Sequence, residues 1–162
     1  MKGTDKFLFG IVIGVILLAL SAFGISMLRA DPAYMEEDTP TGVVNNYLVA
    51  LQEEDYERAY GYLYSRLPGY PKDADQFYAD IINSSWSFRT ERSPSLTIVK
   101  EDLYGTMATV TVDEEIFYEG ILFDGGQSSN RFTFKLFKTG DTWKIREAKF
   151  YWFYCWTNGN CR

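Results

Sequence analysis

One uncharged stretch, from Phe7 to Leu28, constrains everything that follows it in the chain. Its 22 residues are almost all apolar, and none of them is acidic or basic. A helix rises about 1.5 Å per residue, so roughly 20 apolar residues match a hydrocarbon core about 30 Å thick. The sequence therefore predicts a transmembrane helix over residues 7–28.

The charges that flank this stretch predict its orientation. Lys2 and Lys6 precede it, whereas Arg29 is the only basic residue close behind it. Cytoplasmic flanks of membrane helices carry an excess of Lys and Arg. We therefore expect residues 1–6 in the cytoplasm and the rest of the chain outside the cell membrane, as a periplasmic or extracellular domain.

A cleaved signal peptide is the alternative to a retained anchor. Its apolar region covers about 7 to 15 residues and ends at a cleavage site with small residues. The stretch here is longer, and Leu28-Arg29-Ala30 begins with a large residue. No Cys follows the stretch directly, so the sequence does not support a lipid anchor, and we favour a retained helix.

Gly10 and Gly14 form a Gly-x-x-x-Gly pair within the apolar stretch. Such a pair removes side chains from one face of a helix and lets another helix backbone approach. The pair predicts a helix contact, either in a homodimer or with a membrane-protein partner. Gly is also common in membrane helices without such a role.

Behind the apolar stretch, the sequence indicates an acidic linker over residues 29–38 and one domain over residues 39–162. The chain has a net charge of -6 and its first 30 residues carry +2, so the remainder carries -8. Surfaces that bind nucleic acid or anionic lipid need clustered Lys and Arg. We therefore expect no nucleic-acid partner.

The hydrophobic period changes from helical to alternating along this domain. Helices are predicted over residues 40–53, after the cap candidate Asp55 as far as Pro68-Gly69, and after the cap candidate Asp73. Alternating segments follow at residues 96–99, 107–123, 132–137 and 143–156, with a hairpin loop over residues 125–130. The predicted fold class is α+β, with three helices packed on an antiparallel sheet behind the transmembrane helix.

Two segments of this domain resemble a known family. Residues 39–60 read TPTGVVNNYLVALQEEDYERAY, and residues 140–145 read GDTWKI. This order is similar to the opening and closing motifs of nuclear-transport-factor-two-like, or cystatin-like, domains. The resemblance implies a cone in which helices and a curved sheet enclose an apolar pocket. Members include isomerases, hydrolases, binding modules and bacterial membrane-anchored domains without an assigned activity, and the last group is the most similar.

Catalytic side chains can be surveyed by residue type. The chain contains no His, which excludes His-based triads and His metal sites. The acidic clusters are read as a helix end with its cap and as a solvated strand face; they are Glu53, Glu54 and Asp55, and Asp113, Glu114, Glu115 and Glu119. We therefore expect no catalytic residue, no metal site and no cofactor.

The end of the predicted last strand is rich in aromatic residues on both faces. A one-sided sheet needs only one apolar set, so the second set is either buried under helices or exposed to a partner or to the membrane interface. Both readings stay open from the sequence. The candidate surface residues are Tyr151, Trp152, Phe153, Tyr154 and Trp156.

Cys155 and Cys161 are the only cysteines, and an Asn158-Gly159 pair lies between them. Asn-Gly favours a tight turn, and an oxidising compartment favours pairing. We therefore predict a structural disulfide between Cys155 and Cys161.

The functional expectation follows from the anchor, the Gly pair and the aromatic end. We expect a single-pass membrane-anchored interaction or accessory domain, a non-catalytic subunit or partner in a membrane assembly. The alternatives are a small-molecule binding module that uses the cone pocket and an isomerase- or hydrolase-like enzyme of the same fold.

Overall fold

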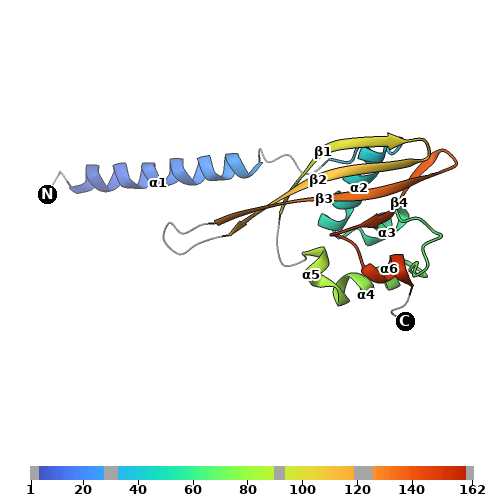
Figure 1. Cartoon of the computed structure of the whole chain (residues 1–162). Coiled ribbons are helices and arrows are strands. Elements are labelled where there is room, and N and C mark those ends of the chain that lie inside the picture. Colours follow the sequence, from blue (N-terminus) through green and yellow to red (C-terminus); the bar gives the residue numbers. More distant parts are fainter. Residues whose placement is uncertain (1–3, 28–32, 90–93, 119–125, 160–162) are drawn as a thin grey trace. The chain divides into compact units, whose positions relative to one another are not determined.

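The computed structural model describes residues 4–27, 33–89, 94–118 and 126–159 (Figure 1). The chain divides into two compact units, with the boundary between Ala33 and Tyr34. The folded domain therefore begins at Tyr34, within the linker that was expected to end at residue 38.

The first unit consists of helix α1, Thr4–Met27. Its side chains are described over residues 9–21, and nearly all of them are exposed. Within the described parts of the chain, no helix is found that has both the length and the apolar character needed to cross a membrane.

The second unit contains one antiparallel sheet of four strands, in the order β1-β2-β3-β4. The strands are β1 (Ser95–Tyr104), β2 (Met107–Tyr118), β3 (Gly126–Thr139) and β4 (Thr142–Ala148). Each strand pairs with its successor in the chain, so the sheet is a meander. The predicted α+β class with an antiparallel sheet is confirmed.

Five helices accompany this sheet, so the described residues contain six helices with α1, where four were predicted. They are α2 (Pro40–Gln52), α3 (Tyr56–Gly61), α4 (Ala74–Asn83), α5 (Ser85–Phe88) and α6 (Tyr154–Asn158). The side chains of Thr39, Asp55 and Asp73 cap the first three, each accepting a hydrogen bond from a backbone N–H three residues ahead. The short α5 and α6 were not predicted.

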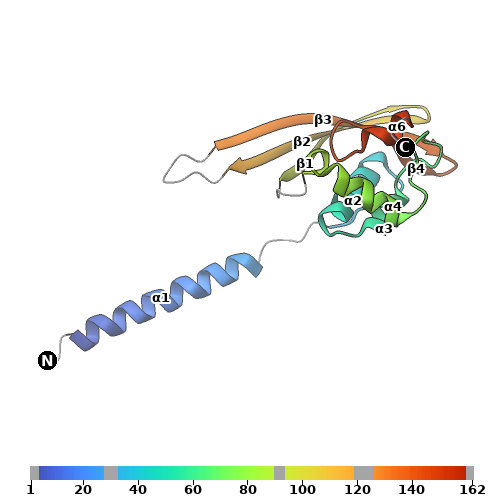
Figure 2. The ribbon, with the colours of Figure 1, turned by 90° about the horizontal axis from the view of Figure 1, so that it is seen from below.

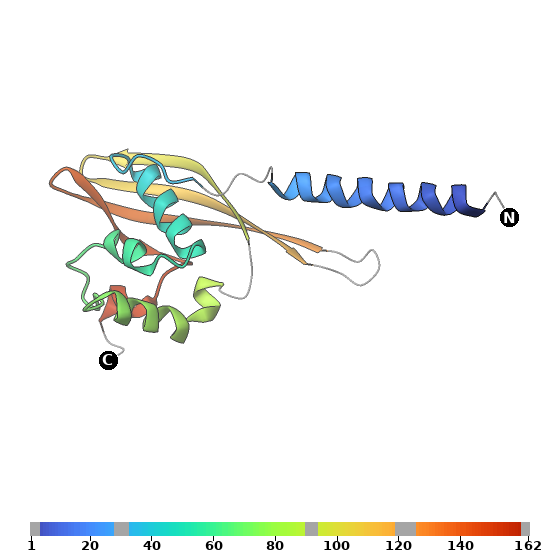
Figure 3. The same ribbon diagram turned by 180° about the vertical axis from the view of Figure 1, so that it is seen from behind.

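All helices of the second unit lie against one face of the sheet (Figures 2 and 3). The covered face of β2 and β3 presents Val110, Val112, Phe134 and Leu136, which are buried. Against them pack Tyr47 of α2, Phe77 of α4 and Trp156 of α6, all buried. This aromatic layer between sheet and helices is the core.

The middle of the other face of the sheet is polar, although the exposed Met107 and Phe117 lie on this face at the two ends of β2. On β2 it presents Thr109, Thr111 and Asp113, and on β3 it presents Arg131, which forms a two-pronged ion pair with Asp113 at 2.6 and 2.7 Å. One sheet face is thus packed and the other solvated, as antiparallel sheets allow.

Two predicted strand boundaries are wrong. Residues 126–130, predicted as part of a hairpin loop, are the first residues of β3 and pair with β2. The last strand ends at Ala148 instead of continuing to Trp156. Tyr151 has φ of 56°, a left-handed conformation that an extended strand cannot contain, and α6 starts soon after it.

Candidate functional site

The most unusual side chain in the core is Glu114. It lies on the same face of β2 as Val110 and Val112, and it is 0% exposed. Its Oε1 accepts a hydrogen bond from the Tyr151 hydroxyl at 2.7 Å and lies 2.7 Å from Nε of Arg89. Asn130 Nδ2 lies 3.4 Å from its other oxygen. The expectation that Glu114 lies on a solvated face is therefore wrong.

The alternation of β2 explains this placement, and it was visible in the sequence. Successive side chains of a strand point to opposite faces, so Glu114 shares a face with Val112 and with Ile116, which is also buried. Asp113 and Glu115 point to the other side. Glu119 lies outside the described residues.

The groups around Glu114 compensate its buried negative charge. A buried carboxylate is costly unless it is paired and hydrogen-bonded, and Arg89 supplies the opposite charge. Burial, and then the hydrogen bond to Glu114, raise the pKa of Tyr151 well above its usual range. The phenol is therefore a neutral donor at physiological pH, and it stabilises the carboxylate.

The Glu114 cluster, defined as Arg89, Glu114, Asn130 and Tyr151, includes two strained residues. Arg89 and Tyr151 have φ of 52° and 56°, a region that side chains other than Gly rarely adopt. Tyr47 Oη donates a 2.7 Å hydrogen bond to the Tyr151 carbonyl, which holds that turn in place. The strain is thus offset by contacts that join β2, the end of α5 and the segment before α6.

Chemically, the Glu114 cluster is suited to linking elements of the fold. A general base must reach a proton of the substrate within hydrogen-bond distance. Glu114 is fully buried, and its carboxylate is occupied by groups of the protein itself. Asp80 is a second buried acid with such a role, because it accepts a 2.7 Å hydrogen bond from Trp156 Nε1.

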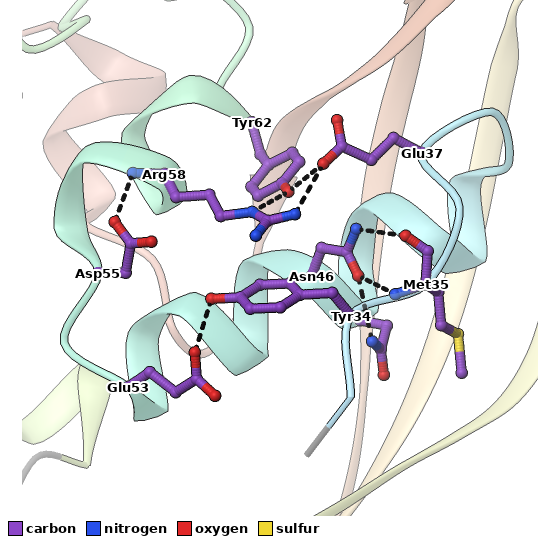
Figure 4. A network of polar contacts seen from close by, with 9 residues as sticks. Tyr34, Met35, Glu37, Asn46, Glu53, Asp55, Arg58 and Tyr62 are labelled. Carbon is purple, nitrogen blue, oxygen red and sulfur yellow. Dashed lines mark hydrogen bonds and ion pairs between the residues drawn. The ribbon is translucent and has the colours of Figure 1, made fainter. Parts of the chain in front are cut away.

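A second polar network holds the tether, defined as residues 34–38, against the helices (Figure 4). Glu37 accepts hydrogen bonds from Tyr62 Oη at 2.7 Å and from Arg58 Nη2 at 3.2 Å. The first of these bonds is the main reason that the pKa of Glu37 lies below its usual range. Arg58 also stacks over the Tyr34 ring at 3.5 Å, and Tyr34 Oη donates to Glu53 at 2.8 Å.

The backbone of the tether is fixed as well. Asn46 accepts a hydrogen bond from Met35 N at 2.6 Å and donates one to Met35 O at 2.8 Å, and Asn46 is fully buried. Gly42 lets the tether approach α2 closely, because a Cβ at this position would overlap the Glu36 carbonyl. The expected solvated linker is thus docked over its last residues.

The acidic cluster at the helix junction also has a structural role. Asp55 caps α3 as predicted, accepting a 3.1 Å hydrogen bond from Arg58 N. Glu53 bonds Tyr34, and Glu54 is exposed. Among the described residues, no group of three or more His, Cys, Asp or Glu side chains is arranged to hold a metal ion.

The aromatic C-terminal segment separates into core and surface. Of the predicted surface residues, Tyr151, Trp152 and Trp156 are buried in the core, so the surface assignment is wrong for them. Phe153 is half-buried, and Tyr154 is 72% exposed. The turn at Tyr151 and the helix α6 replace strand alternation, which explains why neighbouring rings point inward together.

An exposed apolar row lies on the helical layer. We define the aromatic strip as Tyr78 and Ile82 of α4 and Trp86 of α5, which are spaced four residues apart; about half of Tyr78 and Ile82 and 78% of Trp86 are exposed. Residues four apart lie on the same face of a helix, so Tyr78 and Ile82 share one face of α4, and Trp86 follows on the next helix, α5. In the sequence, Tyr78 and Ile82 stand directly beside the apolar Phe77 and Ile81, but only Phe77 and Ile81 are buried in the structure.

A groove of about 710 Å³ adjoins Trp86. It runs between α5, the end of β4 and α6, and its lining includes Trp86, Glu147, Lys149, Phe153 and Tyr154. Tyr154 and Trp86 are the most exposed rings of this lining. Exposed Tyr, Trp and Phe rings are enriched at protein interaction sites, so the rings of this groove favour such a role.

The predicted disulfide and helix contact are tested only in part. Cys155 is buried in α6 and is not a free thiol, whereas Cys161 lies outside the described residues. The pairing therefore stays a prediction. Gly10 and Gly14 lie on α1, and a Cβ added at either would meet no atom within 4 Å. Their contact with a second helix also stays a prediction.

Comparisons with known proteins give no family. No family model matches the chain, and no curated protein matches it. Solved structures that are similar include two bacterial proteins. One is a SEC-C motif containing protein from Rhodopseudomonas palustris, with 16% identity and a TM-score of 0.48 over 70% of this chain and 80% of that chain. The other is a protein of unknown function from Mycobacterium tuberculosis, with 11% identity and a TM-score of 0.46 over 81% and 73%. Neither is similar enough to indicate a function.

The Glu114 cluster predicts a graded set of stabilities. Glu114→Ala should lower the free energy of unfolding by about 3–5 kcal/mol, because it leaves Arg89 buried without its partner. Tyr151→Phe should lower the free energy of unfolding by about 1–3 kcal/mol, because the buried Glu114 carboxylate loses one hydrogen-bond donor. The control Asp113→Ala removes a solvent-screened surface ion pair and should change the free energy of unfolding much less than Glu114→Ala does. Urea denaturation of residues 34–162 measures all three, and equal costs for Glu114→Ala and Asp113→Ala would contradict the assignment.

The tether predicts a contrast between two glycines. Gly42→Ala should cost about 1–3 kcal/mol, because the new methyl group overlaps the Glu36 carbonyl. Amide exchange at Met35 should become faster in this variant, because the hydrogen bond to Asn46 is lost. Gly61→Ala is the matched control: its Cβ meets nothing within 4 Å, so stability should stay the same or rise slightly. Unchanged exchange at Met35 in Gly42→Ala would show that the tether is not held this way.

Proposed function

We propose that this chain is a single-pass membrane-anchored extracytoplasmic interaction domain, a non-catalytic partner in a membrane assembly. The observation that carries the proposal is the character of α1 together with the sequence around it. Ile11, Val12 and Ile13 are consecutive and each is exposed by nearly half. Consecutive helical residues point in different directions, so the helix is apolar around its whole circumference.

A helix that is apolar on every side is stable only when it is surrounded by protein or lipid. The uncharged stretch Phe7–Leu28 extends at both ends beyond the side chains that are described in α1, and its 22 residues suit a bilayer. Lys2 and Lys6 support a cytoplasmic N-terminus. An extracytoplasmic address in turn favours the proposed bridge between Cys155 and Cys161.

The interaction role is supported by how the domain uses its side chains. The covered face of the sheet, where a cone-type ligand would bind, is filled by side chains: Phe134 of β3 packs edge-on against Tyr47 of α2 with ring centroids 5.9 Å apart, and Trp156 of α6 belongs to the same buried cluster. The acid on that face, Glu114, is paired with Arg89. The groove beside Tyr154, by contrast, opens to solvent. Helices on one face of an antiparallel sheet are consistent with the proposed nuclear-transport-factor-two-like relationship.

The anchor is tested by extraction. The full chain should remain in the membrane pellet after alkaline carbonate treatment, and protease added to spheroplasts should remove the folded domain. Leu17→Arg places a charge near the middle of the stretch, which disfavours insertion by about 2.5–3.5 kcal/mol, so a large part of the chain should become extractable. Leu17→Ile is the control and should behave as the natural chain. Complete extraction of the unchanged chain, or protection of the domain from protease, would overturn the anchor or its orientation.

The partner role is tested by copurification in mild detergent. After Trp86, Tyr154 is the most exposed ring of the groove. Because exposed aromatic rings often anchor interfaces, Tyr154→Ser should weaken recovery of specific partners roughly tenfold. Tyr104→Ser is the matched control, because Tyr104 is also a largely exposed Tyr but lies on the turn between β1 and β2. Circular dichroism should show both variants folded. Equal recovery of partners with both variants would count against the groove.

A further inference from the structure

The aromatic strip carries no exposed charge. Between Gln76 and Phe88 the only ionisable acid or base is Asp80, which is 4% exposed and bonds to Trp156 inside the core. Within α4 and α5 the exposed side chains beside the strip are uncharged: Ala79, Asn83 and Ser85. Charged side chains lie across the groove on another segment, where Glu147 and the exposed Lys149 share its lining with Trp86. In a chain with 23% charged residues, this neutral surface with an Ile, a Tyr and a Trp is an unusual one.

The strip begins close to the point where the chain enters the domain. The ring centroids of Tyr78 and Tyr56 are 4.8 Å apart, and Tyr56 is the first residue of α3. Glu53, three residues before Tyr56, accepts the hydrogen bond from Tyr34. In Figures 1 and 3, α5 and the start of the domain lie at the same end of the second unit. The turn between β1 and β2 lies at the opposite end.

The length of chain before Tyr34 limits how far this end can be from the bilayer. If the apolar stretch ends at Leu28, residues 29–33 are all that connects it to the docked tether. A fully extended chain spans at most about 3.6 Å per residue, so the connection reaches roughly 20 Å. With the proposed anchor, Tyr34, where the domain begins, would therefore lie within about that distance of the end of the apolar stretch.

We infer that the aromatic strip rests in the headgroup region of the bilayer beside the chain's own anchor. The inference depends on the proposed membrane anchor. Trp and Tyr favour this region because each has an apolar ring with a polar tip, and Ile82 adds an aliphatic contact between them. The strip lacks Lys and Arg, so zwitterionic lipid suffices and anionic lipid is not required.

This contact also fixes the orientation of the domain. Leu103, Tyr104 and Met107, at the turn between β1 and β2, are exposed at the far end and therefore point away from the membrane. Tyr104 is thus a natural control position, with an exposed ring that the bilayer does not reach.

Tryptophan fluorescence gives a direct test, because three of the four tryptophans are buried. Trp143, Trp152 and Trp156 are at most 6% exposed, whereas Trp86 is 78% exposed. The full chain is reconstituted in phosphatidylcholine vesicles with and without a headgroup spin label. The spin label should quench a substantial part of the emission, and Trp86→Phe should abolish most of that quenching.

The control is the double variant Trp86→Phe with Tyr104→Trp. The tryptophan introduced at the far turn should be quenched by aqueous acrylamide but not by the spin-labelled headgroups. Equal headgroup quenching at both positions, or quenching that requires anionic lipid, would overturn the inference.

Carbonate extraction and quenching of the same samples distinguish failure of the proposed membrane contact from failure of the proposed anchor. If the chain resists carbonate extraction but Trp86 is not quenched, the anchor stands and the inference falls, with a protein partner as the occupant of the strip. If carbonate releases the chain from the vesicles, the proposed anchor fails, and the inference fails with it.

Discussion

The buried charge of Glu114 sets conditions that much of the domain must meet. A carboxylate on the covered face of a sheet needs a cation and a donor close by, and Arg89 and Tyr151 provide them from segments distant in the chain. Both residues have left-handed backbone in this arrangement. The turn at Tyr151 ends the extended chain after β4, and α6 follows. It thereby places Trp156 in the core and leaves Tyr154 outside.

The parts of the fold that depend on neighbouring residues were predictable. The caps at Thr39, Asp55 and Asp73 each use a side chain and a backbone N–H three residues apart, so the sequence contains the whole interaction. The meander of β1 to β4 follows from alternation and short turns, such as Tyr104-Gly105 and Gly140-Asp141. Helix ends and strand order therefore agree with the prediction better than strand lengths do.

The parts that depend on distant residues were not predictable in the same way. The alternation of Val110, Val112 and Glu114 was readable and places Glu114 inward, but only knowledge of Arg89 and Tyr151 makes a buried acid acceptable there. Extension through Phe150 to Trp156 is a reasonable reading of a run of rings, because β-strands favour aromatic residues. The tertiary contacts of Tyr151 override that local preference.

The docked tether shortens the connection between the apolar stretch and the folded domain. Had residues 34–38 remained solvated, they would have added up to about 18 Å to the reach of the connection, at about 3.6 Å per residue. Asn46 and Arg58 remove that length by holding Met35 and Glu37 against the helices. With the proposed membrane anchor, this short connection would keep the strip of Tyr78, Ile82 and Trp86 near the bilayer at a high effective concentration. Under that proposal, weak contacts of three exposed side chains would be enough to orient the domain, although they could not recruit a free domain to a bilayer.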